Sequence, residues 1–161
     1  MRAGIGYDVH RLEKGIPLIL GGADIPHEKG AVGHSDGDVL CHAVVDAVLG
    51  AANLGDIGTH FPSEENQWKG VSSLVFLTRV AEAIRQKGYS LVNIDCTVIL
   101  QNPRIDRHVG RMKGAMAHAL SIDIHQISIK ATTTDTLGFI GDEDGIAAMA
   151  VVTLSLPASR S

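Results

Sequence analysis

Two short segments in the first quarter of the chain carry side chains that commonly bind metal ions. The first contains Asp8 and His10, and the second contains His42. Alternate residues of a strand point to the same side, so a strand over residues 2–10 would present Asp8 and His10 together. A helix presenting His42 to this strand would complete a set of two imidazoles and one carboxylate. Such a set is typical of catalytic zinc, which keeps one position open for substrate or water.

A purely structural role for these residues is the alternative. Histidines are often partly buried without binding a metal, and an aspartate can simply cap a backbone group. We therefore treat one zinc ion per chain, on Asp8, His10 and His42, as a hypothesis. Asp46 lies one helical turn after His42, so we expect its carboxylate to accept a hydrogen bond from that imidazole.

The run from His34 to Asp38 predicts the start of a helix. Ser35 suits the N-cap and Asp38 suits the acidic first turn. The free N–H groups of a helix start also bind anions, so a phosphate near His34 and Ser35 is the functional interpretation. The sequence alone does not separate it from an ordinary capped helix.

A third polar group stands at the end of a predicted strand, with Lys130, the threonines from Thr132 to Thr134, and Asp135. A lysine and several hydroxyl groups at a strand end suggest phosphate contacts. A threonine-rich strand followed by a turn is the simpler explanation. Asp56 and Gly58 are a weaker signal, because this pair also occurs in ordinary turns.

The elements that must position these residues follow from hydrophobic patterning and turn residues. Strands are predicted over 2–10, 16–22, 89–101, 127–133 and 146–156, and helices over 38–52, 72–87 and 103–120. Pro103 suits the first turn of the last helix. Residues 23–36, 53–71 and 134–145 are predicted loops, and the loop over 53–71 is long enough to be mobile and functional.

This order of elements predicts an α+β fold with a single mixed sheet and helices on one face. No helix is left to cover the other face, and the last strand, from Ile146 to Leu156, is strongly apolar. We therefore expect that face to pack against further copies of the chain. The length of 161 residues suits a single domain over residues 1–161.

Composition argues against several classes of protein. The net charge is −4, the basic residues form no run, and aromatic residues make up only 4%, so nucleic-acid binding is not expected. No apolar run approaches the roughly 20 residues that span a membrane. Cys41 and Cys96 stand in apolar stretches and are expected to be reduced. Together with the lack of a signal-peptide pattern, this predicts a cytoplasmic protein.

The motifs above belong to a series that runs through nearly the whole chain. The series comprises Gly6-Tyr-Asp-Val-His10, Gly21-Gly22, His34-Ser-Asp-Gly-Asp38, His42 with Asp46, Leu54-Gly-Asp-Ile-Gly58, Phe61-Pro62, Lys69-Gly70, Asn93-Ile-Asp95, Lys130-Ala-Thr-Thr-Thr134 and Leu137-Gly-Phe139. In this order and spacing, the chain resembles the family of 2-C-methyl-D-erythritol 2,4-cyclodiphosphate synthases of non-mevalonate isoprenoid biosynthesis.

The resemblance implies an enzyme, a CMP-forming phosphorus–oxygen lyase. Its substrate would be 4-diphosphocytidyl-2-C-methyl-D-erythritol 2-phosphate, whose 2-phosphate attacks its own β-phosphate and releases CMP. The resemblance further implies a homotrimer, packed through the uncovered sheet face, with active sites between neighbouring subunits. A second divalent ion, Mg²⁺ or Mn²⁺, would bind the substrate diphosphate.

The resemblance also assigns roles to individual residues. It implies zinc on Asp8, His10 and His42, and the methylerythritol phosphate at His34 and Ser35. The ribose would contact Asp56 and Gly58, and the cytosine would contact the backbone from Leu100 through Arg104 to Ile105. The diphosphate would contact Thr132 and Thr133. Lys69 and Lys130 are further expected substrate contacts. Asp135 would lie beside the second ion, where the family usually has the longer Glu, so a water could bridge the gap. The expected catalytic residues are Asp8, His10, His42, His34, Thr133 and Asp135.

The chain departs from the family at Asp142, where the family often has an Arg facing a cavity on the trimer axis. Because carboxylates there would repel an anion, we expect no isoprenoid diphosphate in that cavity.

Two other functions stay open. A zinc phosphohydrolase could use the same three ligands with a bound water, and a trimeric binding protein would perform no chemistry. Product analysis separates the first from a synthase, and metal analysis tests the second.

Overall fold

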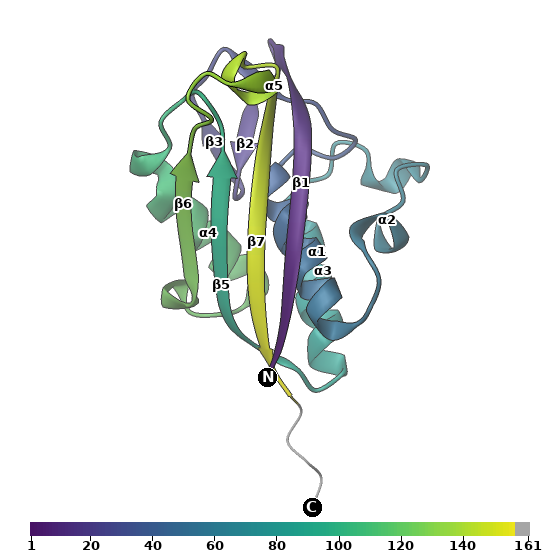
Figure 1. Cartoon of the computed structure of the whole chain (residues 1–161). Coiled ribbons are helices and arrows are strands. Elements are labelled where there is room, and N and C mark those ends of the chain that lie inside the picture. Colours follow the sequence, from purple (N-terminus) through teal and green to yellow (C-terminus); the bar gives the residue numbers. More distant parts are fainter. Residues whose placement is uncertain (157–161) are drawn as a thin grey trace, which may run out of the picture.

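A five-stranded mixed sheet forms the framework of the protein, in a computed structural model that describes residues 1–156 (Figure 1). Its strand order is β4-β1-β7-β5-β6, where β5 and β6 run parallel and all other neighbours run antiparallel. The strands are β1 (Arg2–Lys14), β4 (Lys29–Ala31), β5 (Ser90–Ile99), β6 (Ile127–Thr132) and β7 (Gly145–Ser155). The predicted α+β class and mixed sheet are confirmed.

A second, two-stranded sheet shows that the prediction of a single sheet was wrong. Its strands are β2 (Leu18–Leu20) and β3 (Ala23–Ile25). Gly21 and Gly22 between them have φ angles of 56° and 74°. Such left-handed values favour a tight hairpin turn, so the predicted strand over 16–22 ends at Leu20. The predicted loop over 23–36 instead contains the short strands β3 and β4.

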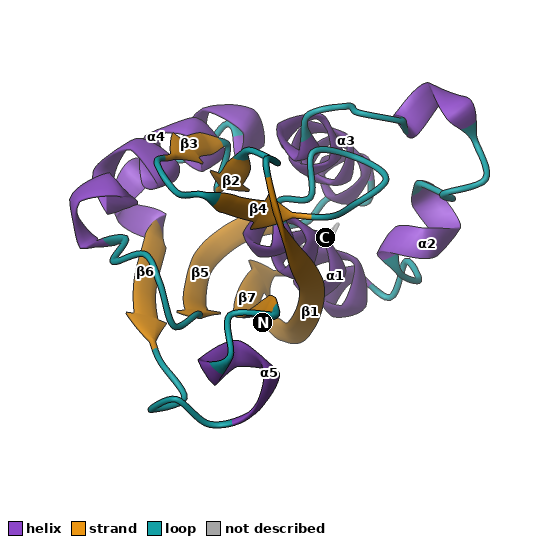
Figure 2. Ribbon diagram, turned by 90° about the horizontal axis from the view of Figure 1, so that it is seen from above, coloured by secondary structure: helices purple, strands orange, loops and turns teal. Residues whose placement is uncertain are grey.

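Three longer helices cover one face of the large sheet, as Figure 2 shows from above. They are α1 (Val39–Ala52), α3 (Ser73–Gln86) and α4 (Val109–Leu120), and shorter helices are α2 (Ile57–His60), η1 (Asn66–Trp68), η2 (Asp106–His108), η3 (Ile124–Gln126) and α5 (Gly138–Gly141). The prediction that a helix starts at Pro103 was wrong, because Ile105 turns into the core and the α-helix begins only at Val109. None of the helices in residues 1–156 has both the length and the apolar character needed to cross a membrane.

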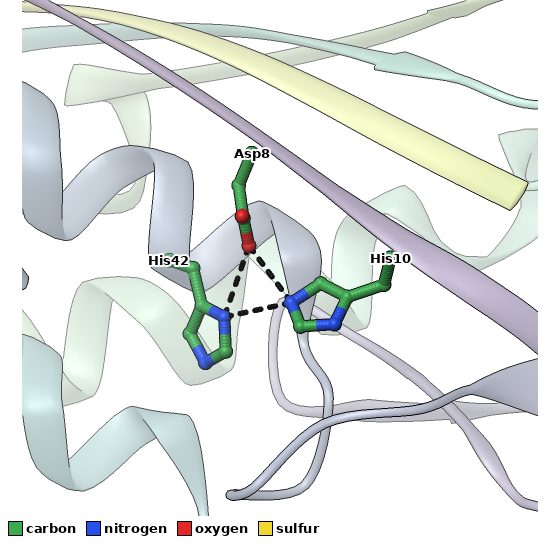
Figure 3. A group of neighbouring side chains, drawn as sticks. All are labelled: Asp8, His10 and His42. Atoms are coloured by element: carbon green, nitrogen blue, oxygen red, sulfur yellow. Dashed lines mark hydrogen bonds and ion pairs between the residues drawn. The ribbon is translucent and has the colours of Figure 1, made fainter. Parts of the chain in front are cut away.

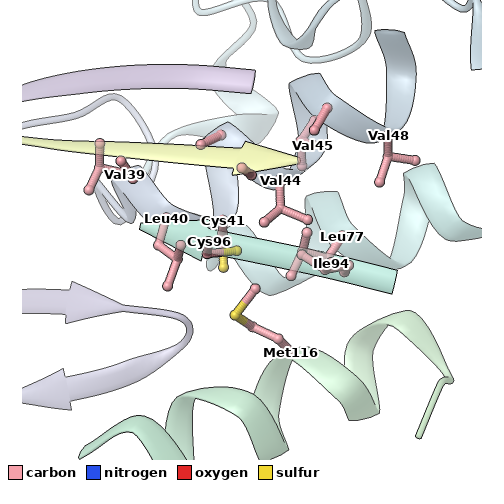
Figure 4. Packing of buried hydrophobic residues seen from close by; sticks show 14 of the residues in the cluster. Val39, Leu40, Cys41, Val44, Val45, Val48, Leu77, Ile94, Cys96 and Met116 are labelled. Atoms are coloured by element: carbon pink, nitrogen blue, oxygen red, sulfur yellow. The ribbon is translucent and has the colours of Figure 1, made fainter. Parts of the chain in front are cut away.

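Helix α1 lies between the sheet and α3 and forms the centre of the core. From Val39 to Leu49, every residue except Asp46 is buried. Apolar side chains from α3, β5 and α4 close around it, among them Leu77, Ile94 and Met116 (Figure 4). The helix that carries His42 is therefore held from all sides.

Strand β1 approaches α1 unusually closely because it has glycine at two inward positions. A Cβ atom added at Gly4 would lie 2.0 Å from the carbonyl oxygen of Ala47, and one added at Gly6 would lie 1.9 Å from that of Ala43. Any side chain there would push the strand away from the helix. The glycines thus bring the strand that carries Asp8 and His10 within reach of His42.

The opposite face of the sheet carries an exposed apolar patch. Ile5, Tyr7 and Val9 of β1 point away from the helices, and their side chains are 65%, 54% and 43% exposed. Met149 and Val151 of β7 pair with Tyr7 and Ile5 in the sheet and are also exposed. We call these five residues the open-face patch. Contiguous apolar patches of this kind mark interaction surfaces.

Candidate active site

Asp8, His10 and His42 converge on one point between β1 and α1 (Figure 3). Oδ2 of Asp8 lies 2.9 Å from Nε2 of His10 and 3.0 Å from Nδ1 of His42. The two ring nitrogens are 3.1 Å apart. The alternation of β1 and the position of His42 in α1 thus bring together the three predicted ligands.

The hydrogen bond between Nδ1 of His10 and the backbone of Val32 determines the tautomer of the His10 ring. Nδ1 of His10 is bonded to the carbonyl oxygen of Val32, which can only accept, so Nδ1 carries the proton. In the neutral ring, Nε2 then presents a lone pair to Oδ2 of Asp8. Two lone pairs that face each other at 2.9 Å need a positive charge between or beside them. Either an additional proton or a metal ion provides it.

The pKa shifts within the triad also indicate a binding site for positive charge. Burial would raise the pKa of Asp8, but hydrogen bonds and charge from His10 and His42 outweigh it and lower the pKa to about 2. Burial would lower the pKa of His10, but the hydrogen bond and charge of Asp8 raise it above its usual value. The carboxylate therefore stays ionised and attracts a cation.

The geometry of the triad suits a tetrahedral zinc ion. Zinc–nitrogen and zinc–oxygen bonds of about 2.0–2.1 Å place neighbouring ligand atoms about 3.3 Å apart. The distances of 2.9–3.1 Å within the triad lie a few tenths of an ångström below this value. Two imidazoles and one carboxylate also form the donor set that zinc accepts in catalytic sites, with the fourth position left open. The residues present therefore fit the metal.

The outer nitrogen of His42 has partners that the sequence analysis did not identify. Nε2 lies 2.9 Å from the hydroxyl oxygens of both Ser35 and Ser73. The expectation that Asp46 accepts a hydrogen bond from His42 was wrong, because its carboxylate accepts the N–H of Ile57, at the start of α2, at 2.7 Å. The His42 ring is turned toward α3 instead of along its own helix.

The start of α1 also differs from the expectation. Asp38, not Ser35, caps the helix by accepting the N–H of Cys41, and its carboxylate also accepts the N–H groups of Gly21 and Gly22. Burial and the charge of Asp36 raise the pKa of Asp38. Ser35 is thereby free to face His42 and any ligand beside it.

A second pocket lies at the other edge of the sheet, with a volume of about 620 Å³. Six predicted substrate contacts line it: Leu100, Arg104, Ile105, Lys130, Thr132 and Thr133. Lys130 pairs with Asp95, and Thr133 exchanges hydrogen bonds with Asp135 at the exposed rim. Its volume lies within the range of pockets that bind small molecules.

The remaining predicted contacts lie on the side of the metal triad. Nε2 of His34 donates to the carbonyl oxygen of Glu65 at 3.3 Å. Asp56 and Gly58 stand exposed at the start of α2, where hydrogen bonds from Thr59 lower the pKa of Asp56. Lys69 is exposed in the loop before α3. None of these four is buried by other parts of the described chain, so all are accessible to a ligand.

The triad and the second pocket lie toward opposite edges of the sheet within one chain. Asp8 pairs with Ala148, Ala148 with Val98, and Val98 with Ala131, which directly precedes Thr132. Three strand spacings separate the ends of this row, a distance of about 14 Å. The structure thus gathers the predicted residues into two groups instead of one.

Asp142 is exposed and does not line the cavity of about 560 Å³ between β1 and α5. Arg11, Phe139 and Asp144 line it, together with Val9. The expectation that no isoprenoid diphosphate binds in a cavity on the trimer axis stays a prediction.

Comparisons with known proteins find matches that span nearly the whole chain. Residues 1–155 match the YgbB family. A curated relative from Clostridium botulinum (strain Okra / Type B1), named 2-C-methyl-D-erythritol 2,4-cyclodiphosphate synthase, is 52% identical over 96% of this chain and 99% of its own length. The structure of the bifunctional IspDF from Campylobacter jejuni matches with a TM-score of 0.91 and 41% identity, over 95% of this chain and 42% of that one. The structure of Plasmodium falciparum IspF in complex with CDP matches with a TM-score of 0.85 and 35% identity, over 98% and 97%.

Proposed function

The chain belongs to the YgbB family, and we propose that it catalyses the reaction for which its curated relatives are named. It converts 4-diphosphocytidyl-2-C-methyl-D-erythritol 2-phosphate to 2-C-methyl-D-erythritol 2,4-cyclodiphosphate and CMP. The protein is thus a CMP-forming lyase of non-mevalonate isoprenoid biosynthesis. The observation that carries this proposal is the convergence of Asp8, His10 and His42 on one point that suits a metal ion.

We assign one Zn²⁺ per chain to this triad. When bound, zinc supplies a Lewis acid for a phosphate oxygen and a template for the folded substrate. The nucleophile is the substrate's own 2-phosphate, so the protein needs no serine or cysteine nucleophile. Its side chains have to hold two phosphate groups close together and exclude water. His34 and Ser35, beside the triad, are placed to hold the methylerythritol phosphate.

We assign the cytidine end of the substrate to the pocket of about 620 Å³. The backbone from Leu100 to Ile105 would contact the cytosine, and Thr132, Thr133 and Lys130 the diphosphate. A relative in this family has been crystallised as a CDP complex, which supports a cytidine nucleotide as ligand. Mg²⁺ or Mn²⁺ would accompany the diphosphate beside Asp135.

Asp56 and Gly58 would contact the ribose, and Lys69 would approach the substrate from the loop before α3. These three residues lie on the side of the metal triad, not in the cytidine pocket. One substrate molecule must therefore touch both groups of residues.

We propose a homotrimer as the way in which both groups meet. The open-face patch supplies apolar surface for packing around a common axis. The separation of about 14 Å within one chain favours sites that combine the triad of one subunit with the pocket of the next. A chain with His42→Ala and a chain with Thr133→Ala, each inactive, should regain activity when refolded together. Failure of such mixtures, or an active monomer, would contradict the shared site.

The reaction itself is tested by incubating the protein with the cytidyl substrate and following ³¹P NMR. The proposal requires the cyclic diphosphate and CMP, and it requires that His42→Ala abolish both. Release of inorganic phosphate would instead identify a zinc phosphohydrolase. If the zinc-loaded protein formed no product at all, a binding protein without catalytic activity would be the remaining interpretation. The single domain over residues 1–161 and the cytoplasmic location stay predictions, and residues 157–161 lie outside the described part.

A further inference from the structure

Ser73 is a buried polar residue for which the proposed function gives no role. Among the described residues, the buried polar and charged side chains are Asp38, His42 and Ser73. Asp38 caps α1, and His42 belongs to the metal triad. Ser73, at the first position of α3, is fully buried and has no assigned function. Burial of a hydroxyl group is costly unless its hydrogen bonds are satisfied, so its partners are informative.

Asp36 fixes the direction of the hydrogen bonds around Ser73. Oδ2 of Asp36 accepts the backbone N–H of Ser73 at 3.0 Å, and Oδ1 accepts that of Asp38 at 3.2 Å. Both carboxylate oxygens are therefore acceptors. The Ser73 hydroxyl, which contacts Oδ1 as well, must donate its single proton to Asp36. The oxygen of Ser73 is left with lone pairs only.

These lone pairs determine the state of the metal ligand. The oxygen of Ser73 lies 2.9 Å from Nε2 of His42 and has no proton to offer, so Nε2 must be the donor. In the neutral imidazole, Nδ1 then carries the lone pair, and it is Nδ1 that faces Asp8 and His10. Ser35, also 2.9 Å from Nε2, can share the same proton.

We propose that Asp36 and Ser73 are positioning residues for the metal centre. Acting in series, they hold His42 in the tautomer and ring orientation that direct Nδ1 at the metal. This inference rests on the proposed metal site and adds two residues to it. Hydrogen-bonded partners of this kind typically account for a 10- to 100-fold difference in metal affinity.

The same two residues join the metal ligand to the loop before α3. The N–H of Asp36 donates to the carbonyl oxygen of Val71 at 3.1 Å, and the N–H of Gly70 donates to that of His34 at 2.8 Å. From α3, Phe76 also stacks on the His42 ring with 6.0 Å between centroids. The residues from His34 to Asp36 therefore help to orient His42 and also anchor the loop before α3.

Neighbouring serines in the chain provide a matched experiment. Ser72→Ala removes an exposed hydroxyl that caps α3 and does not contact His42, whereas Ser73→Ala removes the hydroxyl that does. Zinc affinity is measured by competition with a chromophoric chelator, and ligand geometry by the visible spectrum of the Co²⁺-substituted protein. We expect Ser73→Ala to bind zinc about 10- to 100-fold more weakly with an altered cobalt spectrum, and Ser72→Ala to match the wild type in both.

Asp36→Asn is the second variant, because its single amide oxygen can replace only one of the two carboxylate acceptors. With that oxygen on the Ser73 hydroxyl, its NH2 group faces the backbone N–H of Ser73. We therefore expect Asp36→Asn to bind zinc more weakly than the wild type, with an altered cobalt spectrum. A folded Ser73→Ala protein with wild-type zinc affinity and cobalt spectrum would overturn the inference. If Ser73→Ala does not fold, wild-type values for Asp36→Asn and Ser73→Cys would overturn it as well. A wild-type protein that binds neither metal would instead refute the proposed metal site itself.

Discussion

Replacing Gly6 by alanine tests whether the close contact between β1 and α1 positions the metal ligands. The added Cβ would lie 1.9 Å from the carbonyl oxygen of Ala43, the residue directly after His42. Packed Cβ atoms stay at least 3.0 Å from their neighbours, so the strand and helix must separate by about 1 Å at this point. Ligand positions around a bound metal tolerate only about 0.2 Å. The separation therefore breaks the triad.

We expect two measurable effects of Gly6→Ala. Overpacking should lower the free energy of unfolding by about 1–3 kcal/mol. For a chain of this length, each kcal/mol lowers the melting temperature by about 2–4 °C, which circular dichroism detects readily. Zinc affinity, measured by chelator competition, should fall by at least about tenfold, and a given zinc concentration should raise the melting temperature less than it does in the wild type.

Gly50 provides the matched control. It lies in α1 as well, and an added Cβ there would have no atom within 4 Å. Alanine is the better helix former, so Gly50→Ala should stabilise the protein by about 0.5–1 kcal/mol without changing zinc affinity. If Gly6→Ala bound zinc as tightly as the wild type and melted at the same temperature, the proposed role of the close contact would be refuted.

Three further predictions concern other parts of the molecule. Burial raises the pKa of Cys96 to about 12 and that of Cys41 well above its usual range. Neither thiol should therefore react with iodoacetamide at pH 8 until urea unfolds the protein. Rapid alkylation of either cysteine in the folded protein, detected by mass spectrometry, would contradict this prediction. Burial lowers the pKa of His10, but the carboxylate of Asp8 outweighs it and raises the pKa above the usual value. In zinc-free protein, protonated His10 therefore stabilises the fold. This stabilisation is complete below a pH of about 6.5 and is lost as the pH rises through the raised pKa. Urea titrations with EDTA at pH 6 and 8 measure it, and zinc affinity should show the opposite trend because zinc needs neutral imidazoles. Trp68, the single tryptophan, packs edge-on against Phe76. In urea titrations, Trp68→Ala should lower the free energy of unfolding by about 1–3 kcal/mol, and Trp68→Phe should lower it clearly less. Equal losses of stability in the two variants would exclude a role for the aromatic contact.

The metal triad could be predicted from the sequence because each half depends on a local pattern. Asp8 and His10 need only the alternation of a strand, and His42 needs only a helix that starts near Asp38. Both elements formed where expected. The hydrophobic faces of strand and helix then leave little choice in how they pack, so the ligands meet.

The surroundings of the triad could not be predicted in the same way. Helical spacing correctly places Asp46 near His42, but the orientation of a ring depends on partners from other elements. Ser73 lies 31 residues further along the chain, and the pair Ser72 and Ser73 looks like an ordinary helix cap. No local pattern indicates that one of two adjacent serines is buried against a histidine.

Errors in the predicted elements have a similar origin. The apolar run before Gly21 forms a strand, but the two glycines that take positive φ reverse the chain there, so the start of the predicted loop forms a second strand. The segment after Pro103 has helical character, yet Ile105 gains more by entering the core than a helical turn would provide. In both places a turn or a tertiary contact overrides local propensity.

The pairing of β1 with β7 has a consequence for the order in which the protein is made. Arg2 of β1 pairs with Leu154 of β7, so β1 gains this one of its two sheet neighbours only when β7 has left the ribosome. Until then β1 exposes an unpaired edge and an apolar surface, which are features that attract chaperones and promote aggregation. Contacts between such distant segments also slow folding. The edge of β1 that pairs with β7 therefore stays unpaired until almost the entire described chain has been made.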